Sequence, residues 1–383
     1  MDETTSATLA EAHGHGYGKD VRIGPMPARV SGPPGGVPLD RAGIDPAVVR
    51  VLRAALGPRR WEPWNAYSEH RAYPSPRTAF LVDAQVRLGE WQWALDPVRD
   101  RLNPVGVTGA PPDPIGTVEV RLGVHPEYLP PEYGTLATAL AWMECGHVGA
   151  ALAEAAAASG VRASWRPDAD GGVLTLTPGG EVTWPWARVM AARSSGLAPI
   201  GFCWDPRPLT GEVLHDLVRA ADETPPGSPA DRAEPLRHSL AVHKVSGTDD
   251  GWYGVAGGHP VPRRLGAAVD TVQAALTYPR GVVDVTGMNV GWVMTAPLMA
   301  TVSAGGPGRY ERLLLAAGAT AQHVATAAAV RGLACRPMRS VREGEIEGAA
   351  GVPADQDFLY LLIIGRPWVR GFNYDLTDPR GDR

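Results

Sequence analysis

The chain has 383 residues, of which 44% are apolar and 20% are charged. This length and apolar content favour two domain-sized cores of about 100–200 residues each. The net charge of −5 excludes the strongly basic face that nucleic-acid binding requires. The three cysteines lack Cys-x-x-Cys spacing, and apolar runs stay far below the roughly 18–20 residues of a membrane span. We therefore expect a cytoplasmic protein without disulfides, a zinc site or a membrane span.

Residues 1–37 are rich in glycine, proline and small polar residues and lack sustained periodicity, which predicts a flexible or wrapping arm. We interpret residues 38–190 as a first repeat. Its expected elements are a helix at Pro46–Leu56, a turn-rich segment at Trp61–Pro76, strands at Thr78–Val86, Trp91–Leu95 and Thr117–Val124, a long helix at Leu136–Ser159 and a strand at Val173–Thr177. Residues 178–193 are expected to form a last strand and a connector.

Residues 191–383 are interpreted as a second repeat of the same kind. Its expected elements are a helix at Thr210–Ala221, a turn at Thr224–Pro229, strands at Ser239–Val245 and Val282–Thr286, a long helix at Arg312–Arg331 and a closing strand at Phe358–Ile364. The order of strands and helices is mixed, with antiparallel hairpins beside one long helix per repeat. This order predicts an α+β fold and not a doubly wound sheet.

The strongest evidence for a repeat lies in the two long helices. The first contains Gly146 and runs through an alanine-rich stretch to Arg166-Pro167, whereas the second contains Gly318 and runs to Arg336-Pro337. The glycines are offset by 318 − 146 = 172 residues and the prolines by 337 − 167 = 170. This near-constant offset indicates a tandem duplication, with two unrelated alanine-rich helices as the alternative. Both helices are apolar nearly all round, so we expect them to pack against each other in an intramolecular pseudo-dimer.

Three strings in the first repeat occur in an informative order. They are Tyr73-Pro74-Ser75-Pro76-Arg77-Thr78-Ala79-Phe80, Glu132-Tyr133-Gly134 and Met143-Glu144-Cys145-Gly146-His147. In content and order they resemble the FMN-dependent nitroreductase superfamily, in particular the SagB/McbC-type dehydrogenases that oxidise thiazolines and oxazolines in ribosomal peptide natural products. The second repeat keeps other strings of that family: Arg193-Ser194-Ser195, Gln322 in the long helix, and Gly365-Arg366-Pro367.

The resemblance implies an FMN site built from both repeats. The residues it assigns to the cofactor are Arg193, Ser194, Ser195 and Arg366 near the phosphate, Tyr73, Pro74 and Ser75 at the ring, and Gln322, with Arg77 and Arg336 as further candidates. Other family strings are degraded in the second repeat, where Ala316 and Ala319 replace the helical glutamate and histidine. Because each repeat keeps family strings that the other has lost, the resemblance implies one competent flavin site per chain.

Azoline oxidation needs a base beside the carbon that loses its proton, and the family assigns this step to a Lys-Tyr pair. Here Tyr133 is kept and Glu132 replaces the lysine, so a desolvated Glu132 with a raised pKa is one candidate base. His147 completes the candidate catalytic set. Glu144 and His147 also have the spacing of half a di-iron motif, but alanines at the matching positions argue against a metal. We expect instead a buried, hydrogen-bonded pair that positions the helix against the flavin or the active-site loop.

The first functional hypothesis is therefore an FMN-dependent azoline dehydrogenase. It would act on a modified precursor peptide, with a cyclodehydratase or leader-binding protein as partner. Two alternatives stay open: a flavin-free scaffold that binds a peptide or partner enzyme, and a nitro- or ene-reductase that uses NAD(P)H.

Overall fold

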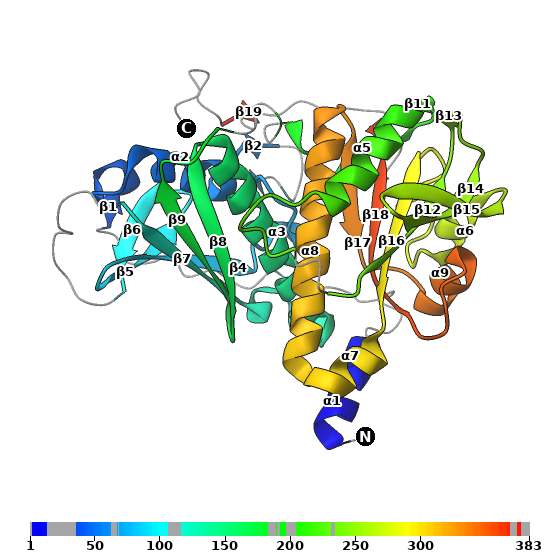
Figure 1. Ribbon diagram of the computed structural model, residues 1–383, viewed down its shortest axis with the longest axis horizontal. Helices are drawn as coiled ribbons and strands as arrows, with labels where there is room; N and C mark the ends of the chain where they lie inside the picture. The colour runs from blue at the N-terminus through cyan, green and yellow to red at the C-terminus, as the bar shows by residue number, and fades with distance from the viewer. Residues whose placement is uncertain are drawn as a thin grey trace.

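Two long helices cross at the centre of the molecule and separate two sheet-containing units (Figure 1). They are α3, Leu136–Ala158, and α8, Pro307–Val330, and most side chains of both are buried. The computed structural model describes residues 2–13, 36–62, 67, 69–105, 116–182, 189, 192–196, 204–230, 234–367 and 374–376. Both helices are long and apolar enough to span a membrane, but 83% and 89% of their apolar windows are buried inside the fold. Their all-round apolar surface is accounted for by packing against each other and the sheets.

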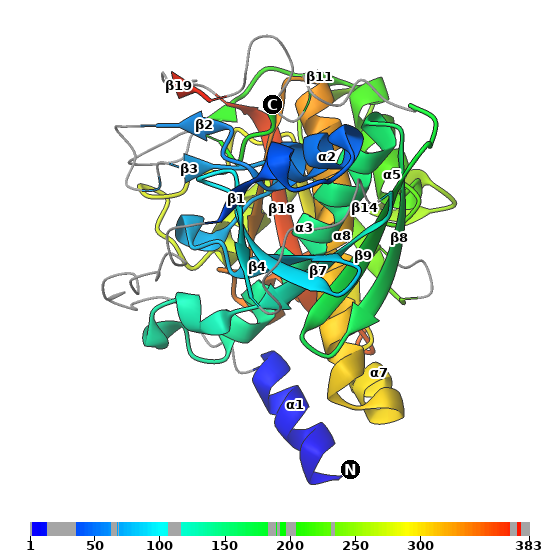
Figure 2. The ribbon, with the colours of Figure 1, turned by 90° about the vertical axis from the view of Figure 1, so that its left-hand side faces the viewer.

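The first unit contains a seven-stranded antiparallel sheet on which α3 and α2, Pro46–Leu56, pack. The strand order is β1 Val37–Pro38, β6 Arg101–Pro104, β5 Trp91–Asp96, β4 Val82–Leu88, β7 Val118–Val124, β9 Gly171–Pro178 and β8 Val161–Asp168. Helix α2 begins where expected, because Asp45 accepts a hydrogen bond from the Ala47 amide and Pro46 is preorganised for the first turn. Figure 2 shows α3 and α8 behind this sheet.

The second unit contains the other large sheet, also antiparallel. Its strand order is β10 Trp204–Asp205, β18 Asp357–Pro367, β16 Val290–Ala296, β12 Arg237–Val242, β14 Gly251–Ala256 and β15 His259–Leu265, with β17 Ala334–Met338 also paired to β18. Helices α8 and α5, Gly211–Asp222, pack together beside this sheet, and α6, Ala268–Ala275, and α9, Glu343–Ala350, pack together on it. Helix α7, Leu298–Gly305, leads into α8.

The two large sheets share one topology. Six strands in each sheet follow the same order: β6-β5-β4-β7-β9-β8 in the first unit matches β15-β14-β12-β16-β18-β17 in the second. In each unit the long helix follows the fourth of these strands in chain order and precedes the last two. The molecule is therefore α+β, with two similarly built units that pack as a pseudo-dimer around α3 and α8.

Both chain ends cross to the opposite unit. Helix α1, Glu3–His13, packs its Leu9 and Ala12 side chains inward and contacts α7 and α8. The C-terminal strand β19, Tyr374–Asp375, pairs with β2, Arg60–Trp61, which in turn pairs with β3, Glu69–His70. Figure 1 shows these crossings at the bottom and top of the molecule. Each unit is thus held by a terminal segment of the other.

Several expected elements differ in the structure. Residues 3–13 are helical, since Asp2 accepts hydrogen bonds from Thr5 and the helix buries its apolar side against α7 and α8, which low periodicity does not reveal. The strand expected at Thr78–Val86 begins only at Val82. The expected strand at Val282–Thr286 is wrong, and the described part of 178–193 contains no strand beyond β9. Trp184-Pro185-Trp186 lies outside the described residues, and a boundary near 190 stays a prediction.

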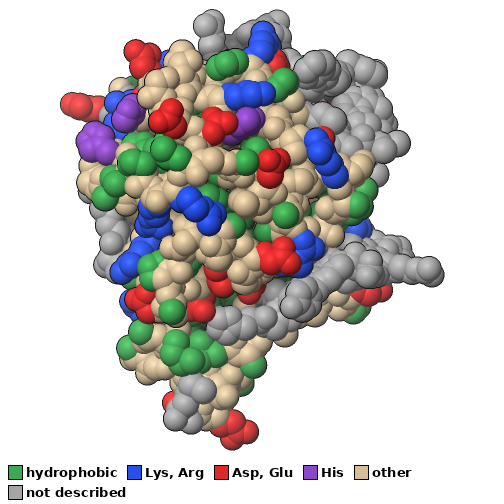
Figure 3. Space-filling model, turned by 90° about the vertical axis from the view of Figure 1, so that its right-hand side faces the viewer, with side chains coloured by type: hydrophobic (Ala, Val, Ile, Leu, Met, Phe, Trp, Pro, Cys, Tyr) green, Lys and Arg blue, Asp and Glu red, His purple; other side chains and the backbone are tan. Residues whose placement is uncertain are grey.

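The outer face of the second unit carries charges of both signs, interspersed with small apolar areas (Figure 3). Strand β15 forms an exposed edge of the second sheet. Pro260 and Pro262 lack the amide protons that another strand would need for pairing along that edge. These prolines protect the edge from pairing with another chain.

Candidate functional site

The segment from Ser75 to Phe80 forms a loop with an unusual backbone. Arg77, Thr78 and Phe80 have positive φ angles of 53°, 54° and 50°, a region that residues other than glycine rarely adopt. Such conformations persist only where the surroundings hold them, and they cluster at functional sites. The loop contains the string that the sequence analysis assigned to the cofactor ring.

The buried carboxylate of Glu144 on α3 holds this loop. It accepts hydrogen bonds from Ser75 Oγ at 2.7 Å and from the Leu81 amide at 2.8 Å. Ser75 Oγ in turn accepts from the Phe80 amide at 2.7 Å, which closes the loop on itself. Glu144 is thus buried and hydrogen-bonded to this loop, as expected, whereas the loop's place in an active site stays a prediction.

The entry to the loop is anchored by a buried arginine. Arg71 donates to Glu69 at 2.8 Å and to the Tyr73 hydroxyl at 3.2 Å, and its guanidinium lies 3.7 Å from the centroid of the Phe80 ring. Burial raises the pKa of Tyr73 to about 12, so its hydroxyl stays protonated at neutral pH. Tyr73 therefore supports the loop from inside, while Pro74 and Ser75 are half-buried.

His147, one turn beyond Glu144, connects the two units. The Gln322 amide nitrogen of α8 donates to the Ala72 carbonyl at 3.1 Å, so the amide oxygen faces His147. That oxygen lies 3.2 Å from His147 Nδ1 and accepts a hydrogen bond from the Nδ1 proton. His147 Nε2 then accepts from the Tyr360 hydroxyl at 3.2 Å. Burial lowers the pKa of His147 to about 3, which keeps the ring neutral in this arrangement. His147 is thus a buried positioning residue between α3, α8 and the loop.

Arg193 lies in the same region and is almost fully buried. It donates to the Arg71 carbonyl at 3.2 Å and to Ser195 Oγ at 3.3 Å, while its Nε is buried and has no hydrogen-bond partner among the described residues. Burial, and secondarily the charge of Arg60, lowers its pKa to about 9. Among the described residues no carboxylate pairs with it. A buried cation of this kind is costly unless an anion compensates it.

A second cation, which is half-buried, lies beside the same segment. Arg336 of β17 donates from Nε to the Ser195 carbonyl at 3.0 Å, and the Cys335 amide donates to the Ser194 carbonyl at 2.9 Å. Burial lowers the pKa of Arg336 to about 10. The structure therefore brings Arg193, Ser194, Ser195 and Arg336 together, next to the loop from the other unit. Their chemistry fits a phosphate, which needs cations and hydroxyl donors.

Other candidates are placed differently. Arg366 lies opposite Asp205 where β18 pairs with β10. The pKa of Asp205 is lowered, first by its hydrogen bond with Arg207 and also by the charge of Arg366. No described contact joins Arg366 to Arg193 or Arg336. Glu132 is exposed on the 3-10 turn η4, Pro131–Tyr133, so the desolvation required of a carboxylate base is missing there. Tyr133 is half-buried, and its ring centroid lies 5.9 Å from the Arg77 guanidinium.

The matching region of the other pseudo-symmetric half is filled by protein. Ser228, in the loop that corresponds to Ser75, has its Oγ 2.7 Å from His323 Nε2, and His323 Nδ1 lies 2.7 Å from Glu154. Thr326 donates to the same carboxylate at 2.9 Å. Pro229 of this loop packs so closely on α3 that a Cβ at Gly149 would overlap it.

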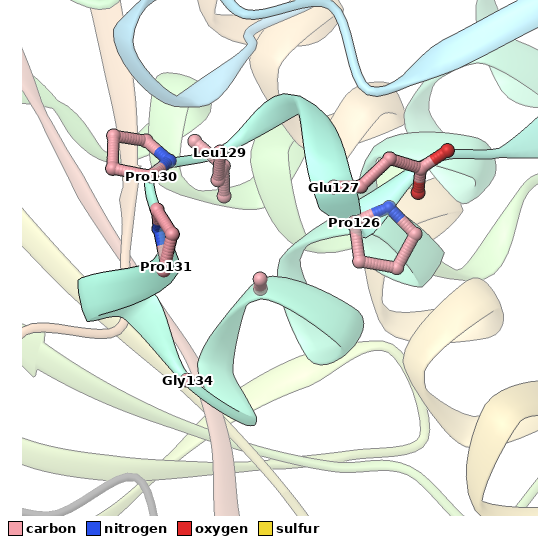
Figure 4. A pocket seen from close by; sticks show the side chains of 7 residues that line it. Pro126, Glu127, Leu129, Pro130, Pro131 and Gly134 are labelled. Carbon is pink, nitrogen blue, oxygen red and sulfur yellow. The ribbon is translucent and has the colours of Figure 1, made fainter. Parts of the chain in front are cut away.

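A hollow of the first unit lies between η3, Pro126–Tyr128, η4 and the start of α3 (Figure 4). Its lining is largely apolar and comprises Pro126, Glu127, Leu129, Pro130, Pro131, Gly134 and Ala137. None of the residues around Arg193 contributes to it. Within the described chain no cluster of three or more histidine, cysteine or acidic residues is arranged for a metal.

Sequence reasoning missed Arg71, Tyr278 and Tyr360. Arg71 lies only two residues before Tyr73, but its burial and its contact with the Phe80 ring depend on how the loop folds back. Tyr278 and Tyr360 are distant in the chain from Tyr133 and His147, and only the tertiary fold brings them to the site.

No protein-family model matches the sequence, and no curated protein matches it. Among solved structures, a protein from Anabaena variabilis provisionally named a nitroreductase is 14% identical with a TM-score of 0.73, over 90% of this chain and 95% of that one. A similarly named protein from Ralstonia eutropha is 16% identical over 55% of this chain and 91% of its own, with a TM-score of 0.39. The E. coli microcin synthetase McbBCD complex contains a chain 14% identical over 49% of this chain and 71% of its own, with a TM-score of 0.37. The chain thus has a nitroreductase-like α+β fold built of two units.

Proposed function

We propose that this protein is an oxidoreductase that binds one FMN between its two units. The observation that carries the proposal is Arg193, a buried cation beside Ser195 and Arg336, whose Nε lacks a partner in the described part of the chain. A phosphate dianion would compensate the buried charge of Arg193 and accept a hydrogen bond from its Nε. The nitroreductase-like fold supports the same assignment, because it is the fold of the family that the sequence resembles.

Each group of residues would hold a different part of the cofactor. Arg193, Ser194, Ser195 and Arg336 would bind the phosphate, and the loop from Pro74 to Phe80 would present backbone groups to the ring. Bound FMN would supply a hydride acceptor. Glu144 keeps the loop in its strained conformation, and the His147–Gln322 bond keeps α8 in register with the loop's entry.

For the substrate we propose a thiazoline or oxazoline ring of a modified precursor peptide, which loses a proton and a hydride to become aromatic. Tyr133, half-buried beside the Arg77 cation, is the group that we assign to proton transfer. Burial raises the pKa of Tyr133 and favours its neutral hydroxyl, whereas the Arg77 cation opposes this shift and stabilises the tyrosinate, which is the form that would accept the substrate's proton. Exposed Glu132 has no comparable environment. A cyclodehydratase or leader-binding protein that supplies the peptide, and a cytoplasmic location, belong to the same proposal.

We infer that the two units arose by tandem duplication and that one of two equivalent sites has closed. The shared strand order and the 172-residue offset of Gly146 and Gly318 support the duplication. The packing of Ser228 and Pro229 against α8 and α3 supports the closure. That closure also favours the alternative of a flavin-free scaffold, if both sites have lost the cofactor.

The test is reconstitution with FMN, followed by the absorbance spectrum of the desalted protein. The native chain should retain flavin, Arg193→Gln should bind FMN at least tenfold more weakly because a charged hydrogen-bonding group is lost, and Arg193→Lys should lie between them. Arg87→Gln, at a 63%-exposed arginine, is the matched control. Thermal unfolding of each variant separates lost binding from lost folding. A native protein that takes up no FMN would exclude the proposal in favour of the scaffold.

A flavin-loaded protein still requires assignment of its reaction. Oxidation of an azoline-containing peptide with oxygen as the final acceptor supports the dehydrogenase. Reduction of a nitroaromatic with NADPH, without azoline oxidation, supports the reductase instead.

A further inference from the structure

The Arg77 side chain lies close to two tyrosine rings at the outer end of the strained loop. Its guanidinium carbon is 5.8 Å from the Tyr67 ring centroid and 5.9 Å from that of Tyr133. Tyr67 is 40% exposed and Arg77 is partly exposed, so both can be reached from solvent. Among the described residues no carboxylate pairs with Arg77. Its guanidinium donates a hydrogen bond to Tyr133, and its other N–H donors can bind an anion.

The backbone at this position argues that the arginine side chain has a function. Arg77 and Thr78 both have φ angles near +54°, which favours glycine, yet an arginine is present. Glu144 and Ser75 fix the loop from the buried side and thereby fix where the Arg77 side chain starts. A strained residue that the surroundings hold in place is typical of a ligand-binding position.

The second unit contributes the facing group. Tyr278 follows α6 and is 39% exposed. It interacts electrostatically with Tyr133 of the first unit and with Arg336, one of the residues assigned to the FMN phosphate. Three tyrosines and Arg77 therefore gather from both units at one edge of the site, next to the residues assigned to FMN.

We propose that Arg77 binds a carboxylate carried by the ring that the enzyme oxidises, and that Tyr67, Tyr133 and Tyr278 are the aromatic walls around that ring. A guanidinium matches a carboxylate with two parallel hydrogen bonds, and tyrosine rings stack on planar heterocycles. The inference rests on the proposed function and narrows it. The preferred substrate is an azoline with a free carboxylate, as at a peptide C-terminus, and not one within an amide-linked chain.

The test uses product-like probes and equilibrium binding, so it does not depend on turnover. 2-Methylthiazole-4-carboxylate and the matching 4-carboxamide are titrated into the protein by calorimetry, before and after reconstitution with FMN. The carboxylate should bind about tenfold tighter than the amide, since its hydrogen bonds are charge-assisted. Arg77→Gln should abolish that preference and Arg77→Lys should retain part of it. Arg99→Gln, at a 56%-exposed surface arginine, should keep the full preference.

Three results would overturn the proposal: equal binding of the two probes to the native protein, a preference that survives in Arg77→Gln, or no binding of either probe in both forms. Absence of FMN uptake is read separately from the spectrum and contradicts the proposed function alone. A carboxylate preference that depends on Arg77 in the flavin-free protein would then still establish the anion site.

Discussion

Gly146 of α3 and Gly318 of α8 make the same contact from opposite sides of one helix crossing. A Cβ on Gly146 would overlap the Leu315 carbonyl, and a Cβ on Gly318 would overlap the Met143 carbonyl. The offset between Leu315 and Met143 is 315 − 143 = 172, the same as that between the glycines. The contact is therefore reciprocal, as in a two-fold symmetric dimer, although both helices belong to one chain.

Replacing either glycine by alanine should destabilise the protein, because the helix backbones must move apart. We expect Gly146→Ala and Gly318→Ala each to lower the free energy of unfolding by about 1–3 kcal/mol, as overpacked cores do. The double variant should cost less than the sum, since one displacement relieves both overlaps. Urea denaturation measures all three.

Gly348→Ala is the control for this pair. Gly348 is exposed in α9 and a Cβ there meets no neighbour, so alanine should stabilise that helix by about 0.5–1 kcal/mol. Full additivity of the two central variants, or stabilisation by either, would contradict a close crossing at these glycines.

Glu144→Gln should release the strained loop. The amide keeps one oxygen acceptor but cannot accept from both Ser75 Oγ and the Leu81 amide, so one buried donor loses its partner. We expect a loss of about 1–3 kcal/mol in the free energy of unfolding and weaker FMN retention. Glu119→Gln, at a 41%-exposed glutamate, should change stability by less than about 0.5 kcal/mol. Unchanged stability in Glu144→Gln would show that the loop holds its conformation without that carboxylate.

The sequence predicted the long helices, α2 and the strings at the site, because these depend on local patterns. It predicted a strand at Val282–Thr286 because valines alternate there. In the structure the Gln273 side chain bonds the Val283 carbonyl and the Val285 amide, at 3.1 and 2.8 Å, and takes the place of a neighbouring strand. When one side chain satisfies backbone groups in this way, the sequence pattern does not distinguish the segment from a strand.

The opposite error occurred at β14 and β15, which the sequence analysis did not expect. Pro260 and Pro262 argue against a central strand, but β15 lies at the sheet edge, where a missing amide proton is tolerated. The grouping of Arg193 with Arg336 was implied by the family resemblance alone. The burial of Arg193 and its orphaned Nε are consequences of tertiary packing that no spacing could predict.

His147 should make the free energy of unfolding fall as the pH is lowered. Its pKa is about 3 in the folded protein, whereas an unfolded histidine titrates near 6.5, so the unfolded state binds more protons between these values. Its contribution is complete above about pH 6.5 and is lost as the pH falls toward 3, at up to about 1.4 kcal/mol per pH unit. His147→Gln should therefore flatten the fall in unfolding free energy below pH 6.5. His259→Gln, at an exposed histidine, should not change the slope. An unchanged slope in His147→Gln would mean that His147 is not held neutral by burial.

Tyr133 and Glu132 make a direct comparison of two candidate bases. Tyr133→Phe should slow azoline oxidation by about a hundredfold, the usual contribution of a proton-transferring group. Glu132→Gln should leave turnover close to that of the native protein, because the carboxylate is exposed and keeps its solvation. Single-turnover reduction of the bound flavin by the substrate measures the step itself. If Glu132→Gln is the slower variant, the exposed carboxylate reaches the substrate and our assignment is reversed.

The number of flavins per chain tests the closure of the second site. Titration with FMN, followed by quenching of flavin fluorescence, should saturate at one equivalent. Ser228 and Pro229 fill the region that would receive a second ring, whereas the buried Arg193 lies beside the loop of the other site. Ser228→Ala removes the contact to His323 without opening that space, so it should still bind one equivalent. Two equivalents in the native protein would show that the loop around Ser228 moves aside for a cofactor, and the asymmetry of the two units would then lie in their chemistry and not in their capacity to bind flavin.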